Sequence, residues 1–183
     1  LPEAERRLLL ESWRGSATAY PRDASIQQLF EAQVDAAPEA VALSFDGGEL
    51  SYRELDERAN RLAHLLARRG GGPEVPIGLY LRRSPEMVIA LVAILKVGGA
   101  YVPLDPDYPA ARLRWMSEDA GLGLLIAAGP LPDELAFPAL TVIDLDAEAD
   151  ALRGEERGRP VAASNGDSLA YVMYTSGSTG TPK

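Results

Sequence analysis

The sequence predicts an α/β protein with a mainly parallel sheet that is covered by helices on both faces. Apolar runs of strand length, such as 75–81 and 124–127, alternate along the chain with longer segments of helical character. These runs are continuously apolar, as strands are when both faces of a parallel sheet are covered. Alternating strands and helices with right-handed crossovers then build one layered sheet.

Capping and turn residues set the ends of the expected elements. Ser51 and Glu54 form a capping box that starts a helix, Ser84 and Pro85 start another, and Asp46-Gly47-Gly48 is the turn of a hairpin. We expect helices at 2–13, 25–37, 52–69, 85–97 and 110–120, and strands at 40–45, 49–51, 75–81, 100–104, 124–127, 140–144 and 168–173.

Two stretches lack the pattern of regular elements. Residues 15–23 are polar and rich in turn formers, which is typical of a connector after the amphipathic helix at 2–13. Residues 144–167 combine Ala, Glu, Arg and Gly without periodicity. We expect this second stretch to be a surface excursion before the last strand.

Composition excludes several classes of function. The 183 residues are 46% hydrophobic and 25% charged, as in an ordinary soluble domain. The net charge of −9 argues against nucleic acid or an anionic membrane as partner. The absence of cysteine excludes disulfides, thiolate zinc sites and thiol catalysis. The single histidine, His64, has no partner histidine with which to form a site.

No targeting or membrane segment is visible in the sequence. The N-terminus has no basic region followed by an apolar one, as a signal peptide would. The longest apolar run, 87–95, is far too short to cross a bilayer. We therefore expect a soluble, cytoplasmic protein.

The last ten residues, 174–183 (YTSGSTGTPK), have the composition of a phosphate-binding loop. They follow directly on the apolar run 168–173, which we expect to be a buried strand. Hydroxyls and backbone N–H groups suit oxyanions, and Gly177 and Gly180 allow close approach of the backbone. Lys183 adds a compact positive charge.

The loop differs from the Walker motif, which requires G-x-x-x-x-G-K-[ST]. Here Gly177 and Gly180 are three residues apart, and Lys183 follows three residues after the second. A flexible Ser/Gly/Thr linker to a downstream segment remains the alternative interpretation.

Three blocks in the chain resemble the adenylation domains of nonribosomal peptide synthetases, which are adenylate-forming enzymes. The blocks are the loop at 174–183, residues 95–106 (LKVGGAYVPLDP) and residues 50–63 (LSYRELDERANRLA). They occur in the family's order. The middle block favours the amino-acid-activating branch over acyl-CoA synthetases.

The resemblance implies the first part of the large N-terminal domain of an adenylate-forming enzyme, truncated at the phosphate loop. The parent would activate an amino acid with ATP, giving aminoacyl-AMP and pyrophosphate. The residues expected to bind the ATP phosphates are Thr175, Ser176, Gly177, Ser178, Thr179, Gly180, Thr181 and Lys183. The catalytic lysine and the magnesium-holding carboxylate are expected beyond Lys183, so the 183-residue piece alone should be inactive.

Cofactors and partners follow from the same resemblance. ATP with Mg²⁺, and phosphopantetheine on a carrier protein that receives the amino acid as a thioester, are the expected cofactors. Carrier-protein and condensation domains of the same synthase are expected partners, together with the amino acid. A small accessory protein, which some adenylation domains require, is a further candidate. Neither nucleic acid nor a membrane is expected.

The resemblance also suggests a division of the chain. Residues 1–23 resemble the helix and linker between a condensation and an adenylation domain, and residues 24–183 resemble the N-terminal portion of the adenylation domain. Asp105, Asp107 and Tyr108 could form a functional carboxylate and phenol group, but a turn set by the surrounding prolines is the favoured interpretation. Two other functions stay open: another adenylate-forming ligase, acting on acyl or aryl acids, and a non-catalytic interaction piece of a synthase.

Overall fold

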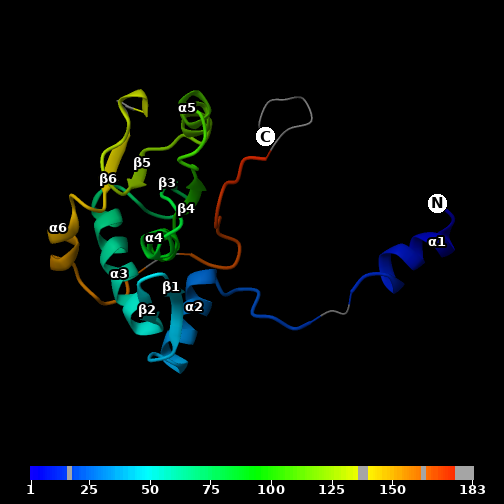
Figure 1. Ribbon diagram of the computed structural model, residues 1–183. Helices are drawn as coiled ribbons and strands as arrows, with labels where there is room; N and C mark the ends of the chain where they lie inside the picture. Colours follow the sequence, from blue (N-terminus) through cyan, green and yellow to red (C-terminus); the bar gives the residue numbers. More distant parts are fainter. Residues whose placement is uncertain (16–17, 136–139, 162–163, 176–183) are drawn as a thin grey trace.

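The computed structural model describes residues 1–15, 18–135, 140–161 and 164–175. Figure 1 shows the arrangement of its main elements. The helices are α1 (Glu3–Arg7), the π-helix η1 (Leu8–Ser12), α2 (Ile26–Ala36), α3 (Tyr52–Arg68), α4 (Pro85–Lys96), α5 (Ala110–Asp119), the 3₁₀-helix η2 (Asp133–Leu135) and α6 (Ala149–Gly154). The strands are β1 (Val41–Phe45), β2 (Gly48–Ser51), β3 (Pro76–Tyr80), β4 (Ala100–Pro103), β5 (Leu124–Ala127) and β6 (Thr141–Asp144).

The central sheet is parallel, as predicted. Its strand order is β4-β3-β5-β6, and every neighbouring pair runs in the same direction. The chain passes from β3 to β4 on one side and then crosses back to place β5 on the other side of β3. β1 and β2 form a separate antiparallel hairpin, and Gly48 in its turn has a φ of 145°, which suits glycine.

Helices cover both faces of the sheet. In Figure 1, α3 and α4 lie on one side of the strands and α5 on the other. Leu125 and Ile126 are adjacent in β5 but belong to different apolar clusters, because side chains alternate across a strand. Ile126 packs in the cluster that contains Ile94 of α4, and Leu125 in the one that contains Met116 of α5.

The predicted caps are present. Ser51 Oγ accepts a hydrogen bond from the backbone N–H of Glu54 (3.2 Å), and the Glu54 carboxylate accepts one from the Ser51 N–H (2.9 Å). The hydrogen bonds that the Ser51 N–H and hydroxyl donate to the Glu54 carboxylate lower the pKa of Glu54. Ser84 Oγ accepts from the Met87 N–H at 3.3 Å, and Gly98, with a φ of 85°, follows the end of α4.

The prediction of a buried strand at 168–173 was wrong. Within the described residues, this segment makes one parallel bridge, between Tyr171 and Tyr101 of β4, and no longer ladder. Leu169, Tyr171 and Met173 are about half exposed, while the residues between them are partly buried. The physical reason is that the segment lies at the edge of the sheet, where only one side contacts the body.

The stretch 144–167 lies at the surface, as expected, and it also contains the short helix α6, which has no buried residue. Arg68 and Arg69 at the end of α3 form ion pairs with Glu155 and Glu148 on either side of α6. His64 of α3 lies with its Nε2 2.9 Å from the carbonyl oxygen of Gly158. The excursion is therefore attached to α3 along much of its length.

The N-terminal helices lie apart from this body in Figure 1. The expected helix at 2–13 begins as α1 and continues as the π-helix η1. Leu10 and Trp13 are well exposed, at 59% and 69%. None of the helices in the described part of the chain has the length and apolarity that a membrane span requires.

Candidate functional site

Of the residues expected to bind phosphate, the structure describes Thr175. Ser176, Gly177, Ser178, Thr179, Gly180, Thr181 and Lys183 lie outside the described residues. The site can therefore be built from the segment that leads into the loop, residues 168–175, and from the groups that hold this segment in place.

The leading segment runs parallel to β4. The backbone N–H of Tyr101 donates to the carbonyl oxygen of Ala170 (3.1 Å), and the N–H of Val172 donates to the carbonyl oxygen of Tyr101 (3.0 Å). The aromatic rings of Tyr101 and Tyr171 lie 5.5 Å apart. Because the bridge is parallel, the chain reaches Thr175 at the carboxyl edge of the sheet, where open α/β sheets bind their ligands.

Tyr174, the last residue before Thr175, is held by the final turn of α5. Its O–H donates to Asp119 Oδ2 at 2.6 Å and lies 3.4 Å from the carbonyl oxygen of Met116. Its ring packs edge-on against Trp115, with centroids 5.3 Å apart. Partial burial, together with the hydrogen bond to the Asp119 carboxylate, raises the pKa of Tyr174 to about 12.

Glu74 holds the opposite end of the segment. Its carboxylate accepts a hydrogen bond from the backbone N–H of Leu169 at 3.0 Å. Its own N–H donates to the carbonyl oxygen of Gly98, also at 3.0 Å. Glu74 has a φ of 61°, and it is the non-glycine residue that takes a positive φ in the described chain. Such a conformation is uncommon for a residue with a side chain and marks a position fixed by its surroundings.

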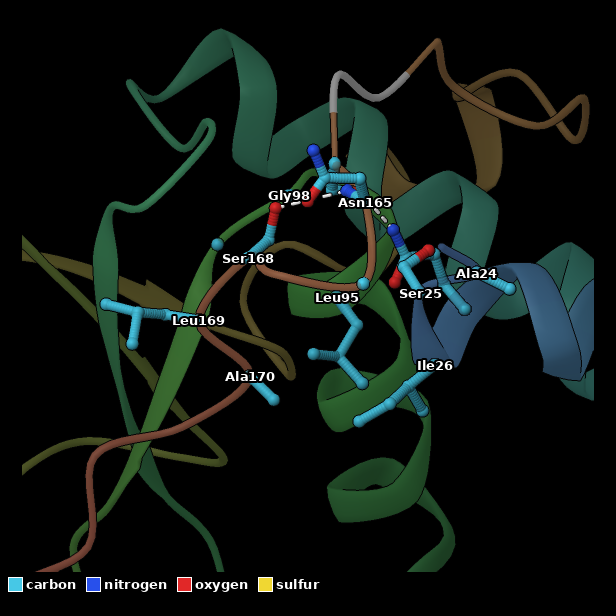
Figure 2. Close-up of a pocket in the computed structure, with 13 residues that line it drawn as sticks. Ala24, Ser25, Ile26, Leu95, Gly98, Asn165, Ser168, Leu169 and Ala170 are labelled. Carbon is cyan, nitrogen blue, oxygen red and sulfur yellow. Dashed lines mark hydrogen bonds between the residues drawn. The ribbon is translucent and has the colours of Figure 1, made fainter. Parts of the chain in front are cut away.

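A small cavity of about 140 Å³ lies under the beginning of the segment. Figure 2 shows residues 164–170 passing between the start of α2, with Ser25, and the end of α4. Gln27 Nε2 donates a hydrogen bond to Ser164 Oγ, and the Asn165 N–H donates to Ser168 Oγ at 3.1 Å. These bonds fasten the start of the segment to α2 and give it a compact turn.

A larger hollow of about 600 Å³ opens at the carboxyl ends of β3 and β4. It is lined by Leu79, Leu81, Arg82, Arg83, Met87, Pro103, Leu104, Asp105, Pro106 and Asp107. Its position is that of a ligand cleft in an open α/β sheet.

The residues Asp105, Asp107 and Tyr108 form a turn, which supports the favoured interpretation. Asp105 Oδ1 accepts from the Asp107 N–H at 3.0 Å, Asp107 pairs with Arg82 at 2.9 Å, and the Arg112 guanidinium lies 4.2 Å from the centre of the Tyr108 ring. Across the described ranges, no three His, Asp or Glu side chains gather as metal ligands.

Sequence reasoning missed a buried charged cluster between α2, α3 and the end of α4. Lys96, the last residue of α4, is fully buried, and its Nζ lies 2.8 Å from Asp56 Oδ1 of α3 and contacts Glu31 of α2. Arg159 approaches the same carboxylates and pairs with Asp35 at 2.7 Å. A lysine that ends a largely apolar helix was the available signal.

Comparisons with known proteins show which family the chain resembles. The family model described as "AMP-binding enzyme" matches residues 30–183. The chain is 45% identical over its full length to tyrocidine synthase 3 of Brevibacillus parabrevis, covering 3% of that protein. It is 42% identical over 98% of its length to bacitracin synthase 1 of Bacillus licheniformis, again covering 3%. The chain thus spans a small part of the curated relatives it matches.

Solved structures show the same likeness. The nonribosomal peptide synthetase FmoA3, in its α-methyl-L-serine-AMP-bound form, superposes with a TM-score of 0.80 at 33% identity, over 91% of this chain and 18% of that one. The N-terminal subdomain of Klebsiella oxytoca NpsA, in complex with 3-hydroxybenzoyl-AMSN, gives 0.75 at 27% identity, over 87% and 40%. These matches confirm the resemblance to synthetase adenylation domains, and the chain belongs to the AMP-binding enzyme family.

Proposed function

We propose that the loop beginning at Thr175 holds the phosphates of ATP in a domain that activates an amino acid as its adenylate. One observation carries this proposal. The segment before the loop runs parallel to β4 and ends at the carboxyl edge of the sheet, next to the ends of the other parallel strands. A loop that starts there projects toward the place where ligands of such sheets bind.

The reaction is a nucleotidyl transfer. A carboxylate oxygen of the amino acid attacks the α-phosphorus of ATP, a new P–O bond forms, and the bond to the β-phosphate oxygen breaks to release pyrophosphate. Negative charge develops on the departing pyrophosphate. Hydroxyl and N–H donors from 175–181 and the ammonium of Lys183 would stabilise that charge by fixed electrostatic contacts.

Magnesium would supply further charge neutralisation at the phosphates when bound. Its carboxylate ligand, in our proposal, belongs to the part of the domain that follows Lys183, as the resemblance to adenylation domains implies. The amino-acid pocket and the catalytic lysine belong there as well.

The amino-acid branch is favoured over an aryl-acid ligase by the degree of similarity. Identity is 33% to the FmoA3 structure with a bound aminoacyl-AMP and 27% to the NpsA structure with an aryl analogue. The proposed product passes to the phosphopantetheine of a carrier domain.

The exposed apolar residues of the N-terminal helices support a division of the chain into 1–23 and 24–183. The first part is proposed to be the connection to a preceding condensation domain. An accessory protein remains a candidate partner.

The test removes two loop hydroxyls in the complete adenylation domain that contains this chain. If Ser178 and Thr179 donate to charged phosphate oxygens, each lost bond costs about 1.5–3 kcal/mol. The double variant Ser178→Ala, Thr179→Ala should then lower amino-acid-dependent adenylation by about tenfold to several hundredfold.

The matched control removes one serine and one threonine hydroxyl from exposed positions on β1 and β6, as Ser44→Ala, Thr141→Ala. Its kinetics should stay close to those of the unmodified domain. Thermal melts check that both double variants are folded. Equal adenylation rates in the two folded variants would contradict the proposal and favour the interpretation of the loop as a flexible linker.

A further inference from the structure

The segment that leads into the phosphate loop is held at both ends by carboxylates from other parts of the fold. At its start, Glu74 accepts from the Leu169 N–H, and at its end, Asp119 accepts from the Tyr174 O–H. Between these points, the backbone of Tyr101 makes the parallel bridge. Groups from the α3–β3 connection, from β4 and from α5 thus hold a stretch of chain that forms no strand of its own.

Tyr174 makes a directional hydrogen bond as well as an apolar packing contact. Trp115 and Asp119 are four residues apart on α5 and therefore share one face of that helix. The ring of Tyr174 meets Trp115, and its hydroxyl meets Asp119. The ring fixes the position of the side chain, and the hydroxyl fixes its rotation.

The place of Asp119 on its helix supports a specific role. Asp119 is the last residue of α5, where the partial negative charge of the helix end disfavours a carboxylate. The O–H bond from Tyr174 offsets this disadvantage. The pKa of Tyr174 is raised to about 12, so its hydroxyl is protonated and donates at physiological pH, as an unperturbed phenol with a pKa of about 10 also would.

The helix that provides this contact is itself rigidly placed. Leu113 and Met116, on the face of α5 that meets the sheet, are each 2% exposed. A position held by a packed helix is more precise than one held by a loop. Thr175 follows Tyr174 directly, so any freedom at Tyr174 passes into the start of the loop.

We propose that Asp119 and Glu74 are positioning residues that set where the phosphate loop begins, Asp119 through Tyr174 and Glu74 through the backbone of Leu169. The inference rests on the proposed function of the loop. Misplacing a binding group by about 1 Å can lower a reaction rate by about a hundredfold. Loss of either carboxylate contact should therefore lower kcat/KM for ATP. The melting temperature of the domain should change little.

The experiment compares two tyrosines of the same segment in the complete adenylation domain. Tyr174→Phe removes the hydroxyl that bonds Asp119 and leaves the ring against Trp115. Tyr171→Phe is the matched control, because it removes the same atom from a side chain that is 52% exposed. Pyrophosphate exchange is measured with ATP varied at saturating amino acid, and with amino acid varied at saturating ATP.

We expect Tyr174→Phe to lower kcat/KM for ATP by about tenfold to a hundredfold while KM for the amino acid stays within about threefold. Tyr171→Phe should change neither. Asp119→Ala should match Tyr174→Phe, and the double variant should be no worse than either single change, because both remove one interaction. Glu74→Gln, which keeps an acceptor for the Leu169 N–H, should retain more activity than Glu74→Ala.

Two outcomes would overturn the inference. One is a Tyr174→Phe enzyme whose kinetics equal those of Tyr171→Phe. The other is an equal loss toward ATP and amino acid that follows a lower melting temperature, which indicates a merely structural role. The loop variant Ser178→Ala, Thr179→Ala is run beside them. If it loses activity and Tyr174→Phe does not, the inference alone fails; if it is also unaffected, the proposed function fails.

Discussion

The buried lysine of α4 is the strongest single test of how this fold is held together. Lys96 has no exposed side-chain surface, and its partners Asp56 and Glu31 are about 10% and 21% exposed. Nζ lies 2.8 Å from Asp56 Oδ1 and 5.8 Å from the centre of the Phe30 ring. Replacement by methionine keeps most of the volume but leaves two carboxylates without their main counterion.

The expected loss is worked from these contacts. Breaking a buried ion pair by removing one partner costs about 3–5 kcal/mol. The lower end applies here, because Arg159 Nε remains 3.7 Å from Asp56 and 3.9 Å from Glu31. We expect Lys96→Met to destabilise the packing of α2, α3 and α4 by about 3 kcal/mol, which corresponds to a factor of about 100 in the opening equilibrium.

Hydrogen exchange of the complete domain, followed by mass spectrometry, measures this locally and avoids assuming two-state unfolding of a large protein. Peptides from α3 and α4 should exchange about 100-fold faster in Lys96→Met. The control is Arg53→Met, which removes an exposed ion pair in which an Arg53 guanidinium nitrogen lies 2.8 Å from Glu39 Oε1. Exposed pairs contribute about 0–1 kcal/mol, so exchange there should change by less than about fivefold.

A compensating change separates the charge effect from packing. Asp56→Asn in the Lys96→Met background removes the more buried of the unpaired carboxylates. Peptides from α3 and α4 should then exchange at least about tenfold more slowly than in Lys96→Met alone. If Lys96→Met exchanges no faster than Arg53→Met, the cluster does not stabilise the fold and the reasoning is refuted.

Two further predictions concern packing and pH. A Cβ added at Gly78 would lie 2.6 Å from Leu125 Cδ1, so Gly78→Ala should lower the free energy of unfolding in denaturant by about 1–3 kcal/mol. Gly123→Ala is the control, because a Cβ there would meet no atom within 4 Å, and its free energy of unfolding should not fall. Equal losses in the two variants would contradict this prediction. The hydrogen bond from Arg159 lowers the pKa of Asp35 below its usual 3.8. This contribution to stability is therefore present above pH 3.8 and lost as the pH falls through the lowered value. The difference in melting temperature between wild type and Asp35→Asn should accordingly be largest near pH 6 and shrink below pH 3.8, and a difference that grows on acidification would contradict the assignment.

The sequence by itself determined the class of fold and most of its elements. Apolar continuity marked β3 and β5 as covered strands, and the local chemistry of Ser51 and Ser84 marked where α3 and α4 begin. These signals are local, because a cap or a turn is made by residues within three or four positions of one another. The three motif blocks identified the family, which the comparisons confirm.

Tertiary structure decided what depends on contacts between distant segments. The stretch at 168–173 has the composition of a buried strand, yet among the described residues it pairs with β4 alone, through one bridge at the edge of the sheet. Lys96 meets Glu31 across 65 positions of sequence, and Tyr174 meets Asp119 across 55. Such pairs are formed by the packing of helices on a sheet, and no periodicity or spacing along the chain encodes which carboxylate a buried lysine or a tyrosine hydroxyl will reach.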